Sequence, residues 1–304
     1  MNENINNQEV SIYELVVAVL KAKWVVAVSA ILSCTISIAL AINLPNYYRS
    51  EVLLSPVQES ETPGLDGQLG GLASLAGFNL SQGNERTKLA LEILKSKQFI
   101  NKLVTEHNLL PQLMAVKAWV RESDSFVFDE EKYNSQTGKW HRKSNEYLGP
   151  EPTVSEIHEA FMSELNIDED SDSGFIKISF THQSPNIAKA WLELIVVEVN
   201  NTLKRRDIAE ANRSIVFLTQ QINQAQVAEI KSMLFNLVEE QMKKIMLAES
   251  RDEYVLKVID PALVADVKFK PKRSLIVVLG TFTGGFLAVI AIVLRRLFRN
   301  NNHV

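Results

Sequence analysis

Two long apolar segments, one near each end, dominate the pattern of hydrophobic and polar positions along the chain. No charged residue occurs from Trp24 to Tyr48, and the segment from Ser274 to Leu294 is also free of charge. At a rise of about 1.5 Å per residue, a helix of about 20 residues crosses the hydrocarbon core of a bilayer. We therefore predict transmembrane helices at residues 24–44 and 274–294. The alternatives fit less well, because a buried core helix of this length usually carries a polar stripe and a signal peptide has a shorter apolar part.

The charges beside these segments predict their orientation. Lys21 and Lys23 precede the first segment, whereas only Arg49 closely follows it, so residues 1–23 are expected in the cytoplasm. Residues 45–273 then lie outside the cytoplasm, and residues 295–304 form a cytoplasmic tail. In a Gram-negative bacterium this is an inner-membrane protein with a periplasmic domain. One observation opposes this orientation, because four basic residues stand on the predicted outer side of the second segment, namely Lys268, Lys270, Lys272 and Arg273.

Composition and charge add little to this outline. The 304 residues carry a net charge of −4, and nothing in them indicates a nucleic-acid partner or an acidic disordered chain. The single cysteine, Cys34, lies within the first apolar segment, so the domain between the segments has no disulfide of its own.

The segment between the two spans contains signals for both strands and helices. Alternating apolar and polar residues predict strands around Val52, Ile178 and Val258, which we expect to pair in a mixed sheet close to the bilayer. Thr153 and Glu156 form a capping box, which predicts a helix that begins after Thr153. Residues 121–152 are polar and irregular, with Trp140 and Tyr147 as their anchors. Residues 59–83 are rich in Gly, Ser and Leu, as either a plain linker or an interacting loop would be.

A very long helix is predicted after Ser184 and Pro185, which supply an N-cap and a first-turn proline. Apolar residues then recur every three or four positions as a heptad seam, at Ile208, Ala211, Ile215, Leu218, Ile222 and Ala225. The pattern slips at Glu229 and resumes, so we expect a helix over roughly residues 185–249 with a changed face or a short break. Such a helix is about 100 Å long and forms an extended arm. Its faces cannot all be buried within one chain, which indicates a homo-oligomer.

Together these elements predict an α+β membrane protein. Two transmembrane helices flank a periplasmic domain, which has a mixed α/β base near the membrane and one long helical arm.

Motifs for catalysis are scarce. The sequence contains neither GxxxxGK[ST] nor GxGxxG, and its five histidines are scattered without partners at metal-ligand spacing. We therefore predict no catalytic, cofactor-binding or metal-binding residues. Asp168, Asp170, Asp172 and Gly174 resemble the start of a calcium loop, but the glycine and the final acidic residue do not fall at the positions that an EF-hand requires. These residues form either an acidic hairpin turn between two strands or a weak ion site.

Four basic residues gather on the predicted long helix, at Lys204, Arg205, Arg206 and Arg213. They could form ion pairs with Asp207 and Glu210, or with their counterparts on a neighbouring chain. The alternative is contact with an anionic glycan or a lipid-linked sugar.

The arrangement of these features resembles the polysaccharide co-polymerases, the chain-length determinants of bacterial O-antigen and related surface polysaccharides (the Wzz group). The resemblance covers the whole chain and rests on the two terminal spans and three motifs. These are the run Gly-Leu-Ala-Ser-Leu-Ala-Gly at residues 71–77, the run Val-Ile-Asp-Pro-Ala at residues 258–262, and Pro271-Lys272 followed after eleven residues by Gly284-Gly285. The segment before the second span departs from the family pattern, because Ala262 and Ala265 replace prolines and Lys270 replaces a serine. Some relatives carry a cytoplasmic kinase after the second span, whereas this chain resembles the kinase-free branch.

The resemblance implies a non-catalytic, ring-forming inner-membrane protein that sets the modal length of a polysaccharide made by a separate membrane polymerase. It also implies contact with membrane lipid, and with lipid-linked polysaccharide as a further partner, but not with nucleic acid or a cofactor. Pro271, which precedes Lys272 in the motif, fixes the backbone just outside the bilayer, while Gly280, Gly284 and Gly285 offer a small-residue face to another helix. That helix could be the chain's own first span, a neighbour's span or a polymerase's. Two other functions fit the same layout, namely a component of a capsule or exopolysaccharide export complex and a two-span extracytoplasmic sensor.

Overall fold

The computed structural model describes residues 20–57, 82–141, 149–170 and 172–301, which belong to two compact units. One unit contains both ends of the chain, residues 1–46 and 269–304, and the other contains residues 47–268. The expectations for the loop at residues 59–83 and for Tyr147 fall almost entirely outside the described residues.

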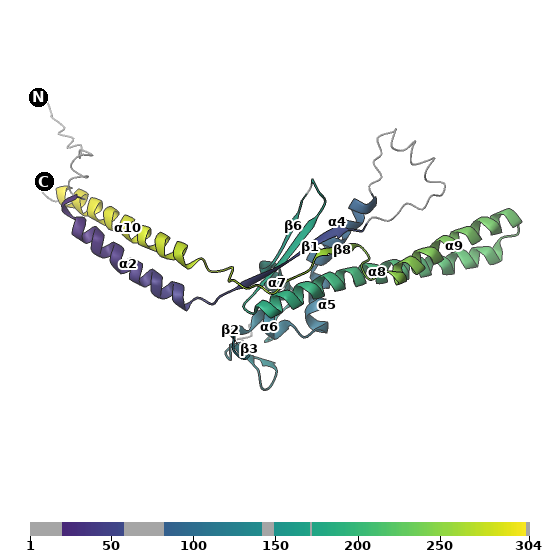
Figure 1. Ribbon diagram of the computed structural model, residues 1–304, viewed down its shortest axis with the longest axis horizontal. Helices are drawn as coiled ribbons and strands as arrows, with labels where there is room; N and C mark the ends of the chain where they lie inside the picture. The colour runs from purple at the N-terminus through teal and green to yellow at the C-terminus, as the bar shows by residue number, and fades with distance from the viewer. Residues whose placement is uncertain (1–19, 58–81, 142–148, 171, 302–304) are drawn as a thin grey trace, which may run out of the picture. The chain divides into compact units, whose positions relative to one another are not determined.

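The first unit is a pair of apolar helices, α2 (Lys23–Asn43) and α10 (Arg273–Asn301), which run side by side (Figure 1). Both are long and apolar enough to cross a membrane. The prediction of one apolar helix near each end is therefore confirmed, although α10 extends a few residues beyond the predicted end at residue 294.

The second unit is built on a four-stranded sheet in the order β6-β7-β1-β8. Its strands are β1 (Tyr48–Pro56), β6 (Leu165–Glu169), β7 (Ile176–His182) and β8 (Leu256–Asp260). Val52 pairs with Ile178 and Leu54 pairs with Val258, so the three strands expected from the sequence do lie together. The expectation of a mixed sheet is wrong, because every pair is antiparallel. The strand β7 follows β6 through a tight hairpin, which joins antiparallel neighbours, whereas parallel neighbours need a long crossover.

Helices cover this sheet and complete the core. They are α4 (Gln82–Lys95), α5 (Lys97–Glu106), α6 (Leu110–Met114), α7 (Val154–Glu164) and the first half of α8 (Pro185–Gln224). The predicted capping box is present, since the Thr153 hydroxyl accepts from the Glu156 amide and the Glu156 carboxylate accepts from the Thr153 amide. Phe161 of α7, Phe180 of β7 and Trp191 of α8 pack with ring centroids 5.2–6.4 Å apart. These rings bring sheet and helices into one core.

Two small hairpins occupy part of the segment that the sequence indicated to be irregular. They consist of β2 (Val116–Val120) with β3 (Ser125–Phe128) and β4 (Tyr133–Asn134) with β5 (Lys139–Trp140). Two-stranded sheets are marginal alone, and here aromatic rings link them. The ring of Tyr133 packs 5.6 Å from that of Phe128 and 5.0 Å from that of Trp140, so Trp140 is an anchor as expected.

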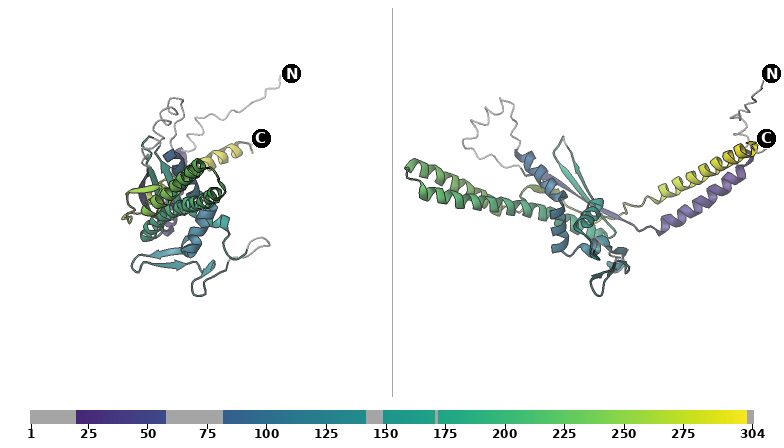
Figure 2. Two further views of the ribbon diagram at one scale, coloured as in Figure 1. Left: turned by 90° about the vertical axis from the view of Figure 1, so that its right-hand side faces the viewer. Right: turned by 180° about the vertical axis from the view of Figure 1, so that it is seen from behind.

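The arm is a helical hairpin and not one helix. Helix α8 ends at Gln224, and α9 (Ala228–Ser250) returns beside it, as both views in Figure 2 show. The helix begins as predicted, because the Ser184 hydroxyl caps it and Pro185 is its first residue. One of the two expected alternatives, a short break near Glu229, is present, but the predicted length of about 100 Å over 185–249 is wrong, because the chain reverses direction at the break. Ala225 and Val227 both have extended backbone, with ψ of 133° and 126°, and they turn the chain between the helices. Ala211 and Ile222 of the predicted heptad seam are buried, and α8 contacts α9 of the same chain.

Candidate functional site

A stripe of serines on α2 faces the glycines of α10. Ser29, Ser33 and Ser37 recur every four residues and therefore share one face of α2. The Ser29 hydroxyl donates to the carbonyl oxygen of Gly284 at 3.0 Å, and the Ser33 hydroxyl donates to that of Gly280 at 2.9 Å. Small and hydroxyl-bearing residues of this kind allow two spans to approach closely in a membrane. The two spans are thus held together by contacts that hydropathy alone does not reveal.

The three glycines do not share one role. A Cβ atom added to Gly280 would lie 1.9 Å from the Ser37 hydroxyl, and one added to Gly284 would lie 2.1 Å from the Ser33 hydroxyl. A Cβ added to Gly285 would meet no atom within 4 Å. Gly280 and Gly284 therefore pack against the chain's own first span, whereas Gly285 leaves a surface with room for a side chain.

Pro271 and Lys272 stand directly before α10. The carbonyl oxygen of Lys272 accepts from the amides of Leu275 and Ile276, at 3.0 and 3.2 Å, so the first turn of α10 starts from it, while the Lys272 side chain is exposed. The neighbouring Arg273 donates to the Leu44 carbonyl and to the Asn46 side-chain oxygen, each at 3.3 Å. This arginine ties the start of α10 to the chain that follows α2.

The four basic residues of α8 do not converge on one site. The Lys204 ammonium donates to the carbonyl oxygens of Arg251 at 3.0 Å and Glu249 at 3.4 Å, which fastens α8 to the end of α9. Arg205 pairs with Glu198 at 3.2 Å. Arg206 and Arg213 are exposed, and Arg213 lines a groove on the arm.

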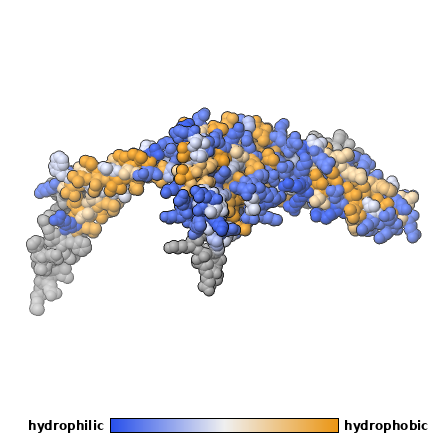
Figure 3. All heavy atoms as spheres, turned by 90° about the horizontal axis from the view of Figure 1, so that it is seen from below, coloured by the Kyte–Doolittle hydropathy of each residue, from blue (hydrophilic) through white to orange (hydrophobic). Residues whose placement is uncertain are grey.

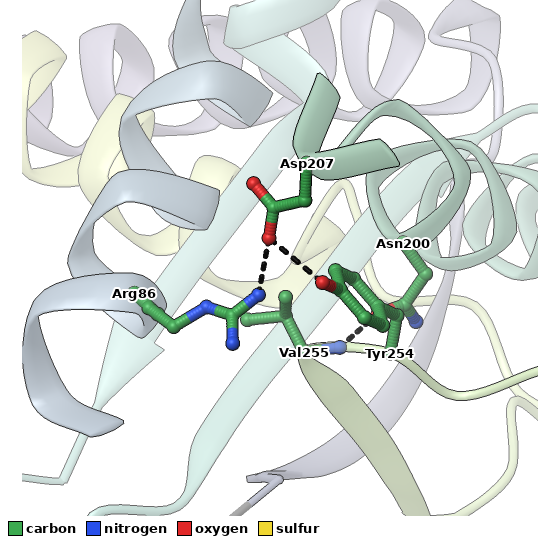
Figure 4. A network of polar contacts seen from close by, with 5 residues as sticks. All are labelled: Arg86, Asn200, Asp207, Tyr254 and Val255. Atoms are coloured by element: carbon green, nitrogen blue, oxygen red, sulfur yellow. Dashed lines mark hydrogen bonds and ion pairs between the residues drawn. The ribbon is translucent and has the colours of Figure 1, made fainter. Parts of the chain in front are cut away.

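Asp207 belongs to a different cluster from the one that the sequence suggested (Figure 4). Its carboxylate forms an ion pair with Arg86 of α4 and accepts from the Tyr254 hydroxyl at 2.8 Å. The Arg86 guanidinium also lies 5.0 Å from the centre of the Tyr254 ring, which allows a cation–π contact. Burial raises the pKa of Tyr254, as does its hydrogen bond to Asp207, so the phenol stays protonated. This cluster joins α4, α8 and the segment before β8.

Asn200 makes a second link between α8 and β8. It is 4% exposed, and its side-chain oxygen accepts from the amides of Val255 and Leu256 at 2.8 and 2.9 Å. Its side-chain amide donates to the Leu256 carbonyl at 2.9 Å. A polar residue on the buried face of a helix is the sequence signal that could have revealed this link. By contrast, the sequence offers no comparable signal for Arg86 or Tyr254, because both lie far from Asp207 along the chain.

The acidic run between β6 and β7 is a hairpin turn. The amide of Asp172 and the hydroxyl of Ser173 donate to the Asp170 carboxylate, which lowers the pKa of Asp170, with the Ser173 contact as the larger cause. Gly174 completes the turn with a φ of +71°, a left-handed conformation that suits glycine. Among the residues that the structure describes, no three His, Cys, Asp or Glu side chains gather as metal ligands. Of the two interpretations, these contacts favour the turn.

The arm has an apolar surface that its own two helices leave uncovered (Figure 3). An open groove of about 420 Å³ lies between α8 and α9, lined by Phe217, Leu218 and Leu237 together with Arg213, Ser214 and Gln241. Large apolar side chains that are at least half exposed along the arm are Val216, Phe217, Met233, Phe235, Met242, Met246 and Leu247. An apolar surface on this scale usually marks an interaction site.

Two models of known protein families match parts of the chain. Residues 8–107 match the family model for the chain length determinant protein (Wzz). Residues 218–297 match the model described as "G-rich domain on putative tyrosine kinase". The chain is similar to the chain length determinant family over residues 8–107. This match supports a role in regulating polysaccharide chain length. The β2–β5 hairpins and the root of α8 lie outside both matched regions.

Two solved structures show similarity to this chain. A full-length bacterial polysaccharide co-polymerase is 12% identical, with a TM-score of 0.39, over 96% of this chain and 99% of that chain. A mutant of the Shigella flexneri lipopolysaccharide O-antigen chain-length regulator is also 12% identical, with a TM-score of 0.20, over 73% of this chain and 100% of that chain. No curated protein matches the chain.

Proposed function

We propose that this protein is a non-catalytic regulator of the length of a surface polysaccharide, the O-antigen of lipopolysaccharide or a related polymer. It acts as a homo-oligomeric scaffold beside a separate inner-membrane polymerase. Both chain termini lie in the cytoplasm, and the domain of residues 47–268 lies in the periplasm. The match of residues 8–107 to the chain length determinant model supports the role in chain length. The observation that supports a homo-oligomeric scaffold is the uncovered apolar surface of the arm.

The exposed apolar side chains of the arm support the proposal that copies of the chain assemble. Phe217 and Phe235 are 59% and 58% exposed, although each arm helix already packs against the other. Burial of apolar area contributes about 25 cal/mol per Å², so side chains of this size favour association with a surface of the same kind. A second copy of the chain offers such a surface, because symmetric assemblies repeat one interface.

The open side of α10 is the surface that we propose for the polymerase contact. Gly285 leaves room there, and Phe282 and Phe286 are 75% and 66% exposed. Because Gly280 and Gly284 pack on α2, they are unavailable to a second protein while the span pair is closed. A polymerase helix would therefore approach the side that carries Gly285.

Deletion of the gene, with gel analysis of the surface polysaccharide, tests the function. If the polymer is still made but its lengths no longer cluster, the result supports the proposed function as a chain-length regulator. Complete loss of surface polymer would instead favour an export component. An unchanged length distribution together with a changed transcriptional response would favour a sensor.

The assembly is tested separately with Phe217→Ser plus Phe235→Ser in the full-length protein. We expect a smaller particle in mild detergent, measured by size-exclusion chromatography with light scattering. Val197→Ser is the matched control, because Val197 is 53% exposed but lies near the root of α8. A particle of unchanged mass in the double variant would exclude the arm as the oligomer contact.

A further inference from the structure

An apolar groove lies between the two spans, at the end where α10 begins. It has a volume of about 400 Å³ and is lined by Ile38, Ala41 and Ile42 of α2 and by Val277 and Val278 of α10. Arg273 and Ser274 stand at one end of the groove. Within a bilayer, such a groove faces acyl chains, and its polar end lies at headgroup level on the side of the periplasmic domain.

Arg273 has hydrogen-bonding capacity that the chain itself does not use. One of its terminal nitrogens donates to Leu44 and Asn46, at the long distance of 3.3 Å in each case. Its Nε is buried and has no hydrogen-bond partner in the part of the chain that the structure describes. A buried donor without a partner is energetically unfavourable. An oxygen from outside the chain would remove this cost, and an anionic oxygen would also complement the guanidinium charge.

Positive charge concentrates at the same place. Lys270 and Lys272 precede Arg273, and the Lys272 side chain is exposed. Basic residues on the outer side of a span run against the usual bias, which places them in the cytoplasm. A local anion would explain their position, since basic pockets between transmembrane helices bind anionic lipid headgroups.

We propose that this groove binds one anionic phospholipid from the leaflet on the domain side. Its phosphate contacts Arg273 and Lys272, and one acyl chain lies along Ile38, Ile42 and Val278. The apolar lining below the guanidinium fits a lipid better than a free anion. A membrane phospholipid fits better than a rarer lipid-linked sugar, because the groove opens sideways to the surrounding bilayer, where phospholipid is always present.

The bound lipid would join the two spans at the end of the pair that the serine contacts do not reach. Ser29 and Ser33 fasten the spans through Gly284 and Gly280, whereas the groove lies beyond Ser37 toward Leu44. The phospholipid is thus a structural part of the span pair, and the site does not depend on the proposed role in chain length.

The test uses the full-length protein in mild detergent, supplied with phosphatidylglycerol or with phosphatidylcholine. Native mass spectrometry should show about one phosphatidylglycerol retained per chain and clearly less phosphatidylcholine. Arg273→Gln should weaken retention by about tenfold, equivalent to about 1.4 kcal/mol, as expected for loss of a charged hydrogen-bonding partner. Arg295→Gln, at the other end of α10, is the matched control and should retain the lipid.

A second variant covers the case in which Arg273→Gln disturbs folding. Val278→Phe keeps every charge but fills the groove, and it should lower phosphatidylglycerol retention while circular dichroism stays unchanged. Equal retention of the two phospholipids, or retention unaffected by both variants, would overturn the proposal. Displacement of phosphatidylglycerol by an equal concentration of isoprenyl diphosphate would assign the groove to a lipid-linked sugar instead. Displacement of phosphatidylglycerol by inorganic phosphate would show that the groove binds only an anion and not a lipid.

Discussion

The hydroxyl of Ser33 on α2 donates a 2.9 Å hydrogen bond to the carbonyl oxygen of Gly280 on α10, across 247 positions of sequence. The same serine lies against Gly284, where any Cβ would come within 2.1 Å of its hydroxyl. Ser33 and the glycine pair therefore act as one unit. Gly284 is glycine because a serine of the chain's own first span occupies the space.

This relationship predicts that Gly284→Ala loosens the span pair and that Ser33→Gly restores it. The alanine methyl would overlap Ser33, and overpacking of this kind costs about 1–3 kcal/mol. Ser33→Gly alone removes one interhelical hydrogen bond, worth about 0.6 kcal/mol in a membrane. In the double variant the methyl has space, so its stability should exceed the sum of the single effects by about 1 kcal/mol or more.

The measurement is SDS titration in mixed micelles, with energy transfer between dyes at Leu20→Cys and Arg295→Cys in a Cys34→Ala background. Additive effects of the two single changes would show that Ser33 and Gly284 do not meet.

Gly285→Leu separates the polymerase contact from the packing of the span pair. A Cβ atom at this position has no atom of the described chain within 4 Å, so we expect the SDS titration to match that of the wild type. If a polymerase helix packs there, the leucine blocks its approach and the modal length of the polysaccharide should change. Gly284→Leu is the comparison variant and should alter both readouts. Wild-type polymer length in Gly285→Leu cells would remove the contact that we propose on this side of α10.

The sequence was informative where a local signal determines a local structure. The Thr153–Glu156 capping box and the cap at Ser184 each begin a helix at the expected residue, because both depend only on neighbours in the chain. Both spans were predicted from the length of their uncharged segments, which is likewise a local property of the sequence.

The sequence failed where the outcome depends on a distant partner. The apolar pattern from Ile208 to Ala225 is the same whether the helix packs on a neighbouring chain or on α9. In addition, no Gly or Pro marks the turn at 225–227. The packing role of Ser29, Ser33 and Ser37 is not evident from the sequence, because hydropathy averages hide a four-residue repeat of small polar residues. Arg86 and Tyr254 reach Asp207 only once α4, α8 and β8 have packed.

Asn200→Ala should be strongly destabilising. The substitution leaves the buried amides of Val255 and Leu256 without the side-chain oxygen that accepts from both. Each unsatisfied buried group costs about 1–3 kcal/mol, so for the two amides we expect a loss of about 2–6 kcal/mol in the free energy of unfolding. Urea denaturation of the full-length protein in detergent, followed by circular dichroism, measures it. Asn201→Ala, one residue further on, should change stability by less than about 0.5 kcal/mol. Equal effects of the two variants would refute the role given to Asn200.

His182 should make the stability of the domain depend on pH. It is 7% exposed, and burial lowers its pKa below the ordinary value of about 6.5. Its Nδ1 accepts from the Ser184 amide at 3.1 Å, and Nε2 lies 3.1 Å from the Gln112 carbonyl oxygen, so the neutral ring with the proton on Nε2 satisfies both contacts. The unfolded chain binds the additional proton more readily than the folded one. The free energy of unfolding is therefore constant above about pH 7.5 and falls as the pH drops below about 6.5 toward the folded-state pKa, by at most about 1.4 kcal/mol per pH unit.

Urea denaturation of the full-length protein in detergent at pH 7.5, 6.5 and 5.5 tests this dependence. His182→Gln should lower stability at pH 7.5 but flatten its decrease toward pH 5.5, because the titrating group is gone. His107→Gln is the control, since His107 is exposed and its replacement should leave the wild-type slope. If the free energy of unfolding of His182→Gln changed with pH as steeply as that of the wild type, the pH dependence would belong to other groups. The variant is needed because carboxylates also bind protons as the pH falls, and only removal of the buried imidazole distinguishes its contribution from theirs.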